Sequence, residues 1–152
     1  MSARPAPPSR GDFAFFHPMR VRWGETDPQA IVFNANYFLY FDVAATEYWR
    51  AAGIDLAADM ARHEVETFAV SAHADFFAPA RFDDLIEVGV RLDRIGRSSM
   101  DFVLGIFRGE QPLTAGRLVY VWTTAGADPR PVPPPEDLVA RMRALEARGG
   151  AS

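Results

Sequence analysis

Two carboxylates, those of Glu25 and Asp27, precede a run of mostly apolar residues in the segment from Trp23 to Asp42. Asp27 is followed by Pro28, and a proline ring disfavours helical backbone in the residue before it. The Asp27 carboxylate should therefore lie on an extended or turn backbone, held off the apolar run that follows. A carboxylate placed in this way can attack a carbonyl carbon or activate a water molecule. The segment is the candidate site of the chain.

A helix predicted directly after this turn supplies the second part of the candidate site. Asn34 and Asn36 are residue types that cap helix starts, and Gly53 suits the left-handed position that ends a helix. Apolar residues recur at helical spacing between them: Tyr37, Phe41, Ala44 and Tyr48 on one line, and Phe38, Ala45, Trp49 and Ala52 on a second. Unpaired N–H groups at the start of such a helix carry partial positive charge and can stabilise an oxyanion beside Asp27.

The same turn also has a structural interpretation, because Asp, Asn and Pro are the usual residues of turns and caps. Glu25 fits a turn role better than the role of a second acid. On residue types alone, both interpretations of Asp27 remain open.

Alternating apolar residues predict strands around this helix. The expected strands cover residues 15–23, 67–77, 85–95, 100–106 and 113–124, and a terminal helix starts near residue 136 with Leu138, Met142 and Leu145 on one face. We expect the last four strands to form a meander. A sheet with a wide apolar face must be covered, and the large apolar helix over residues 36–52 is the available cover. The predicted fold is α+β, a curved antiparallel five-stranded sheet wrapped round a long central helix.

The histidines do not form a recognisable site. His17, His63 and His73 have neither helical pairing nor carboxylate neighbours suited to a metal. Ser71, His73 and Asp75 share one face of the second predicted strand, but side chains two residues apart point in parallel, so we expect no relay among them.

Composition limits the remaining possibilities. The 152 residues are 49% hydrophobic, which indicates one globular domain over residues 13–148, after a proline-rich leader over residues 1–12 that we expect to be disordered. A net charge of −4 argues against a nucleic-acid surface. The absence of cysteine excludes disulfides, thiolate metal sites and a cysteine nucleophile. No apolar run approaches membrane-spanning length, and we expect a cytoplasmic protein.

The segment resembles the signature of hot-dog thioesterases of the 4-hydroxybenzoyl-CoA thioesterase type. That signature has an aromatic residue, a short acidic turn, the pattern Asp-x-x-Gly-[IV]-[VI]-[FY], and an Asn-Tyr pair at a helix start. The matching residues are Trp23 to Asp27, Ile31 to Phe33, and Asn36 with Tyr37. Ala30 stands where the family usually has glycine, and Asn34 where it often has His or Tyr. Residues 79–84 also resemble the family's Pro-Ala-Arg-[YF]-x-Asp connection.

This resemblance implies a hot-dog fold and hydrolysis of an acyl- or aryl-CoA thioester. Asp27 would be the catalytic carboxylate, as nucleophile or as general base. The backbone N–H groups near Asn34 and Ala35 would polarise the carbonyl, and Tyr37 would contact the substrate. Arginine suits phosphate through its forked donors, so candidates for holding coenzyme A are Arg94, Arg97 and Arg130.

The resemblance also implies a homo-oligomer, a dimer or a homotetramer. From the Asp27 turn and the lack of a metal-ligand pattern we expect hydrolysis without a metal or other cofactor, with coenzyme A as part of the substrate. Asp42 and Glu47 are rival carboxylates, because other hot-dog thioesterases place their acid on the central helix. Two alternative functions share the fold: a hot-dog acyl-CoA hydratase, and a non-catalytic acyl-CoA-binding domain.

Overall fold

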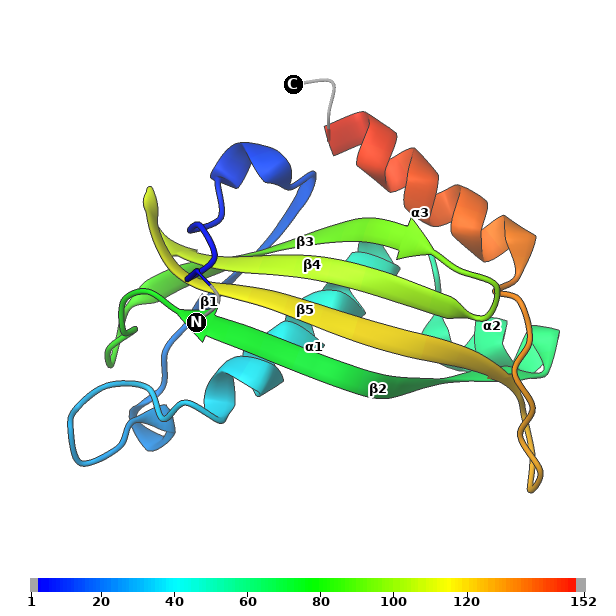
Figure 1. The fold of residues 1–152 in the computed structure, drawn as a ribbon, viewed down its shortest axis with the longest axis horizontal. Helices are drawn as coiled ribbons and strands as arrows, with labels where there is room; N and C mark the ends of the chain where they lie inside the picture. The colour runs from blue at the N-terminus through cyan, green and yellow to red at the C-terminus, as the bar shows by residue number, and fades with distance from the viewer. Residues whose placement is uncertain (1–2, 150–152) are drawn as a thin grey trace.

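A five-stranded antiparallel sheet curves around one long helix, which lies behind the sheet in Figure 1. The computed structural model describes residues 3–149. Its elements are β1 (Phe15–Arg20), α1 (Asn36–Ala51), α2 (Leu56–His63), β2 (Val65–Phe76), β3 (Leu85–Ile95), β4 (Ser99–Arg108), β5 (Gln111–Thr124) and α3 (Glu136–Gly149), with short 3-10 turns at Arg10–Asp12 and Trp23–Glu25. The predicted arrangement of a curved sheet round a central helix is confirmed.

The order of the strands corrects the predicted meander. The sheet runs β1-β3-β4-β5-β2, so only β3, β4 and β5 are consecutive neighbours, and β2 pairs with β5 at the far edge. Residues 77–84 must then cross the end of the sheet to reach β3. Periodicity identifies strands but not their partners, which is why the sequence did not show this crossover. The crossover brings Ala80 beside the Asp27 segment, where the N–H of Val32 donates to the carbonyl of Ala80 at 2.9 Å.

Helix α1 fills the concave side of the sheet, within one residue of the predicted limits. Its buried residues are Tyr37, Tyr40, Phe41, Ala44, Ala45, Tyr48 and Trp49. Gly53 has a φ of 76°, and the N–H groups of Gly53 and Ile54 donate to the carbonyls of Arg50 and Trp49, which closes the helix as predicted. The side of the helix away from the sheet is partly open, and Leu39 is 61% exposed there.

Helix α3 packs with the predicted residues Leu138, Met142 and Leu145 buried. It lies beside the part of β3 that β1 leaves unpaired, since the β1 pairing ends at Val90. There the Glu146 carboxylate accepts hydrogen bonds from the N–H of Leu92 and the hydroxyl of Tyr48, both at 2.6 Å. The side chain of Glu146 on α3 thus accepts the hydrogen bond of the Leu92 N–H group, which has no partner in a neighbouring strand.

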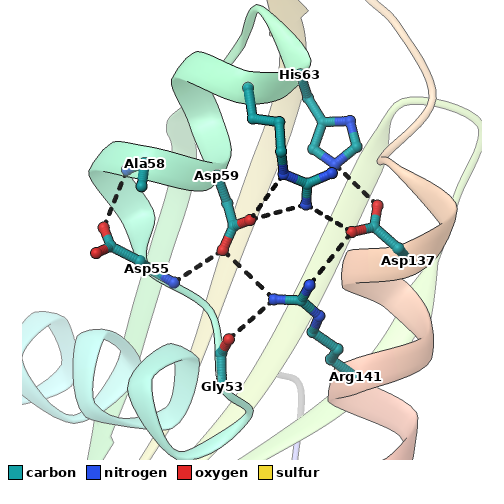
Figure 2. A network of polar contacts seen from close by, with 8 residues as sticks. Gly53, Asp55, Ala58, Asp59, His63, Asp137 and Arg141 are labelled. Atoms are coloured by element: carbon teal, nitrogen blue, oxygen red, sulfur yellow. Dashed lines mark hydrogen bonds and ion pairs between the residues drawn. The ribbon is translucent and has the colours of Figure 1, made fainter.

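An ion network joins α2 to α3 (Figure 2). Arg62 contacts Asp59 at 2.8 Å and Asp137 at 2.7 Å, and Arg141 reaches both carboxylates from α3. The hydrogen bonds from Arg62 hold the pKa of Asp59 and of Asp137 below its ordinary value. His63 also contacts Asp137, with 2.8 Å between Nε2 and Oδ1. The network fixes the short α2 against the terminal helix.

Two smaller expectations are corrected, and the expected absence of a Ser71-His73-Asp75 relay agrees with the structure. β1 ends at Arg20, and Trp23 lies in a 3-10 turn with 73% of its surface exposed, not on a strand face. His63 and His73 do have carboxylate neighbours, because His73 Nε2 lies 2.9 Å from Asp75 Oδ2. The side chain of Ser71 makes no hydrogen bond within the described part of the chain, so no three-residue relay forms.

The prediction of a disordered leader falls partly outside the described residues, since Met1 and Ser2 are not described. Residues 3–12 are described in contact with the folded domain: Arg4 donates to the carbonyl of Phe76, Arg10 pairs with Glu87, and Arg10–Asp12 forms a 3-10 turn.

Candidate active site

The backbone around Asp27 forms a closed turn. The N–H of Asp27 donates to the carbonyl of Ile31, and the N–H of Ala30 donates to the carbonyl of Asp27, both at 2.9 Å. The Asp27 carboxylate accepts the N–H of Gln29 through Oδ1 at 2.8 Å. Its Oδ2 has no hydrogen bond to any described residue, and the side chain is half-buried. The predicted turn backbone is therefore present, with one carboxylate oxygen unengaged.

Ala30 closes this turn in the left-handed region, with a φ of 61°. A residue with a Cβ atom loses about 1–2 kcal/mol in that conformation, whereas glycine does not. The position is the one where the resembling family usually has glycine. Alanine therefore keeps the shape of the turn at a conformational cost.

The start of α1 differs from the predicted asparagine cap. The capping residue is Ala35, which has helical backbone angles and no side-chain hydrogen bond. Asn36 instead donates its side-chain amide to the carbonyl of Glu25 at 2.8 Å. The N–H groups of Asn36, Tyr37 and Phe38 bond to carbonyls three residues earlier, the last two at 3.3 Å.

The N–H groups of Asn34 and Ala35 remain available. Neither donates a hydrogen bond to another described residue, and both residues are exposed. They precede a helix of 16 residues, whose N-terminus carries partial positive charge. Two N–H donors are thus free at the place where the sequence predicts carbonyl polarisation.

Glu25 has the turn role that the sequence favours. Its Oε1 accepts the N–H of Arg22 at 2.6 Å, and its Oε2 lies 3.2 Å from the Arg22 guanidinium. Its carbonyl accepts from Phe33 and Asn36. Glu25 therefore fixes the approach to α1.

An apolar cavity of about 270 Å³ opens beside these groups. It is lined by Ile31, Val32, Asn34, Tyr37, Phe76, Phe77, Ala78 and Pro79. The Tyr37 hydroxyl accepts the N–H of Ala80 at 3.0 Å. Burial raises the pKa of Tyr37, the hydrogen bond from Ala80 opposes the rise, and the charges of Asp84 and Asp27 add to it. The cavity therefore combines an apolar wall with Asn34, Tyr37 and the nearby charge of Asp27.

Neither Asp27 nor the rival carboxylates line this cavity, but the charge of Asp27 acts on Tyr37, which does line it. Asp42 is exposed on α1, and Glu47 pairs with Arg50 one turn further along. The hydrogen bond from Arg50 holds the pKa of Glu47 below its ordinary value.

The predicted coenzyme A arginines lie at the other end of the sheet. β3 starts beside the Asp27 segment and runs for 11 residues to Ile95. At about 3.3 Å per residue, Arg94 and Arg97 are roughly 30 Å from that start. Arg130 follows β5 at the same end and pairs with Asp128 at 3.3 Å. A single chain therefore does not bring these arginines to Asp27.

The structure adds one arginine that sequence patterns missed. Arg143 of α3 lines a cavity of about 400 Å³ with Arg97 and a smaller one with Arg94. None of these three makes an ion pair or hydrogen bond with another described residue. Helical spacing predicted the buried face of α3. It gave no indication that the exposed Arg143 lies near Arg94 and Arg97 of the β3–β4 hairpin.

Within residues 3–149, no three His, Cys, Asp or Glu side chains gather in a group able to hold a metal ion. No helix in the same range is long and apolar enough to cross a membrane.

Comparison with known proteins places the chain in a family. A model of the thioesterase superfamily matches residues 29–115, more than half of the chain. The acyl-CoA thioester hydrolase YbgC of Escherichia coli O6:H1 is 28% identical over 130 residues, which are 85% of this chain and 96% of that protein.

Two solved structures have the same fold. A protein of Pseudomonas aeruginosa strain PAO1 is 33% identical, with a TM-score of 0.80 over 93% of this chain and 97% of that one. A 4-hydroxybenzoyl-CoA thioesterase mutant in complex with 4-hydroxybenzoyl-CoA is 20% identical, with a TM-score of 0.77 over 84% of this chain and 97% of that one. The fold is the hot-dog fold that the sequence predicted, and the chain belongs to the thioesterase superfamily.

Proposed function

We propose that the protein hydrolyses an acyl- or aryl-CoA thioester to the free acid and coenzyme A. One observation carries the proposal: Asn34, whose N–H group is unengaged like that of Ala35, lines an apolar cavity together with Tyr37, and the charge of Asp27, which has an unengaged carboxylate oxygen, acts on Tyr37. The names of the relatives support the same chemistry, since YbgC is described as an acyl-CoA thioester hydrolase. The acyl or aryl group would occupy the cavity.

The residues divide the reaction between them. The N–H groups of Asn34 and Ala35 would donate to the thioester oxygen and stabilise the negative charge that develops there. Asp27 would attack the thioester carbon, so that the C–S bond breaks, the thiolate of coenzyme A leaves and takes a proton, and water then hydrolyses the mixed anhydride. In the other route, Asp27 removes a proton from the water that attacks the carbon. Both routes use the same carboxylate oxygen.

The Asp27→Asn variant tests this assignment. Asparagine keeps the size and turn-forming capacity of Asp27, so the fold should persist, while turnover should fall at least ~100-fold, as is typical for the loss of one general acid or base. Release of coenzyme A is followed with a thiol-reactive dye across acyl- and aryl-CoA substrates. Asp42→Asn and Glu47→Gln are the controls. Loss of hydrolysis in Asp42→Asn but not in Asp27→Asn would move the site to the middle of α1.

Two further outcomes separate the alternative functions. Tight binding of acyl-CoA without any thioester cleavage by the unmodified protein would favour the non-catalytic binding domain, and hydration of an enoyl-CoA would favour the hydratase. We also propose that hydrolysis needs no metal or other cofactor. Activity lost to a chelator and restored by zinc would contradict this.

We propose that the protein is a homo-oligomer, because one chain alone does not bring the candidate coenzyme A arginines near Asp27. Strand β2 is an edge strand of 12 residues with exposed apolar side chains such as Val70, and Leu39 is exposed on α1. An edge of this kind is a template for pairing with another chain. Antiparallel pairing of the middle of two β2 strands about a twofold axis would set the Val65 end of one chain toward the Phe76 end of the other. The Phe76 carbonyl itself stays outside this pairing, because it accepts from Arg4 of its own chain.

This pairing would shorten the distance between Asp27 and the candidate coenzyme A arginines, which lie far apart within one chain. The Phe76 end of β2 borders the cavity, while the Val65 end lies beside the connector that holds Arg130 and the hairpin that holds Arg97. A partner would thus bring its own arginines toward this chain's Asp27. We include Arg143 with the predicted arginines as a candidate for the phosphates of coenzyme A, because forked guanidinium donors match phosphate oxygens.

Light scattering and one arginine variant test this arrangement. The proposal requires a mass at least twice that of the 16.9 kDa chain at micromolar concentration. Arg97→Met should raise KM for acyl-CoA about tenfold, as expected for the loss of a charged hydrogen bond, and should leave KM unchanged for a thioester that lacks the nucleotide. Arg148→Met, an exposed arginine of α3, is the matched control. A monomer in solution, or equal KM changes for both substrates, would be incompatible with it.

A further inference from the structure

The N-terminal arm, residues 3–13, follows the face of the sheet that points away from α1. Phe13 is buried against Gly89 of β3 and Gly105 of β4. A Cβ atom at Gly89 would lie 2.6 Å from the Phe13 ring, and one at Gly105 would lie 2.9 Å from it. These distances are too short for a side chain at either position, so only glycine leaves room for the Phe13 ring of the arm to pack against β3 and β4. The family match starts at residue 29, and the arm lies outside it.

Arg10 holds the middle of the arm. Its guanidinium lies 3.1 Å from Glu87, donates to the carbonyl of Gly109 at 3.2 Å, and stacks on the ring of Phe16 at 4.5 Å. The arm between Arg10 and Arg4 contains three prolines, which restrict the free chain and reduce the entropy lost when it is held in place. The N-terminal arm is therefore anchored at Phe13 and Arg10, and its prolines stiffen the segment from Arg10 to Arg4.

The arm ends on the wall of the candidate active-site cavity. The Arg4 guanidinium donates to the carbonyl of Phe76 at 2.5 Å and lies over the ring of Phe77, 4.8 Å from its centroid. Phe76 and Phe77 both line the cavity, and the ring of Phe76 contacts that of Tyr37 edge-on at 5.1 Å. Phe76 is the last residue of an edge strand, so β5 supports this wall from one side and Arg4 supports it from the other.

We propose that Arg4 is a positioning residue that holds the Phe76–Phe77 wall and thereby sets the size of acyl group that the cavity accepts. The inference rests on the proposed function for its substrate, an acyl-CoA. Without Arg4, the end of β2 would retain the bonds of the Phe77 and Ala78 N–H groups to the carbonyl of Leu113, but would lose its contact on the outer side. The wall would then open more often and admit longer acyl groups.

Arg4→Met tests the inference, because methionine retains an unbranched side chain without the charge or the donors. Hydrogen exchange of a peptide covering residues 75–80 should become about threefold to tenfold faster, as expected for the loss of one exposed hydrogen bond and one cation–π contact. Exchange in β4 should not change. Arg4→Lys should restore slow exchange in part, and Arg148→Met should have no effect.

Binding of S-alkyl-CoA thioethers, which cannot be hydrolysed, provides the second measurement. Calorimetry on the full-length protein should show that Arg4→Met shifts the ratio of affinities for a long-chain and a short-chain thioether at least threefold toward the long chain. Unchanged exchange, an unchanged ratio, or no binding of either thioether would overturn the inference. A protein that binds both thioethers with the expected ratios but cleaves no thioester would overturn the proposed hydrolysis and leave the role of Arg4 supported.

Discussion

Replacing Ala30 with glycine should stabilise the protein while leaving the catalytic turn intact. Ala30 has a φ of 61°, a conformation that costs a residue with a Cβ about 1–2 kcal/mol. Glycine removes this cost but gives the unfolded chain more freedom, which offsets about 0.4–1 kcal/mol. The net gain in the free energy of unfolding should be roughly 0.5–1 kcal/mol. For a domain of this size, the melting temperature should rise by about 1–4 °C.

Urea unfolding and thermal melting of the unmodified protein and Ala30→Gly measure this gain. Gly53→Ala is the matched control, because Gly53 has a φ of 76° and no atom within 4 Å of an added Cβ. That variant should lose about 1 kcal/mol through backbone strain alone. Thioester cleavage by Ala30→Gly should stay within about threefold, since the Asp27 turn keeps its hydrogen bonds. A destabilised Ala30→Gly variant would refute the assignment of strain to Ala30.

Two other predictions concern the core. Gly116→Ala would place a Cβ 2.3 Å from the Phe41 ring of α1, and overpacking of this kind should lower the free energy of unfolding by about 1–3 kcal/mol, measured by urea unfolding; unchanged stability would show that α1 can shift. Burial, with a contribution from Asp42, raises the pKa of Tyr120 to about 12 from its ordinary value of 10.0. The folded state therefore holds the proton more tightly than the unfolded chain, so this contribution is complete below pH 10 and is lost as the pH rises to 12. Thermal melting from pH 9 to 12, compared with Tyr120→Phe, measures it, and equal pH dependence in both proteins would contradict the raised pKa.

Local patterns were sufficient for the elements that build the site. Helical spacing gave α1 because its apolar lines face the sheet, and Gly53 marked its end because the left-handed position suits glycine. Asp27 was placed on a turn because the following proline restricts its backbone. Each of these predictions depends on interactions within a few residues along the chain.

The hydrogen-bond partner of Asn36 and the strand partner of β2 depend on long-range contacts, which local sequence patterns do not show. Asn36 has the residue type of a helix cap, yet its side chain bonds to the carbonyl of Glu25, 11 residues earlier. β2 has the period of a strand, but its place beside β5 depends on pairing across the whole sheet. In both cases the residue type allowed several partners, and the tertiary structure selected one.

The arginines show why a binding surface is harder to predict than a catalytic turn. All 16 basic residues are arginines, and the sequence gives no means of telling those that bind ligands from those that are already paired. Ten of them form ion pairs within the described part of the chain. Arg130, a predicted phosphate holder, is one of these ten, whereas Arg94, Arg97 and Arg143 are not. A guanidinium beside a carboxylate has part of its charge and donors already used. The free arginines on α3 and the β3–β4 hairpin are therefore better candidates for phosphate than Arg130, and only the fold brings them together.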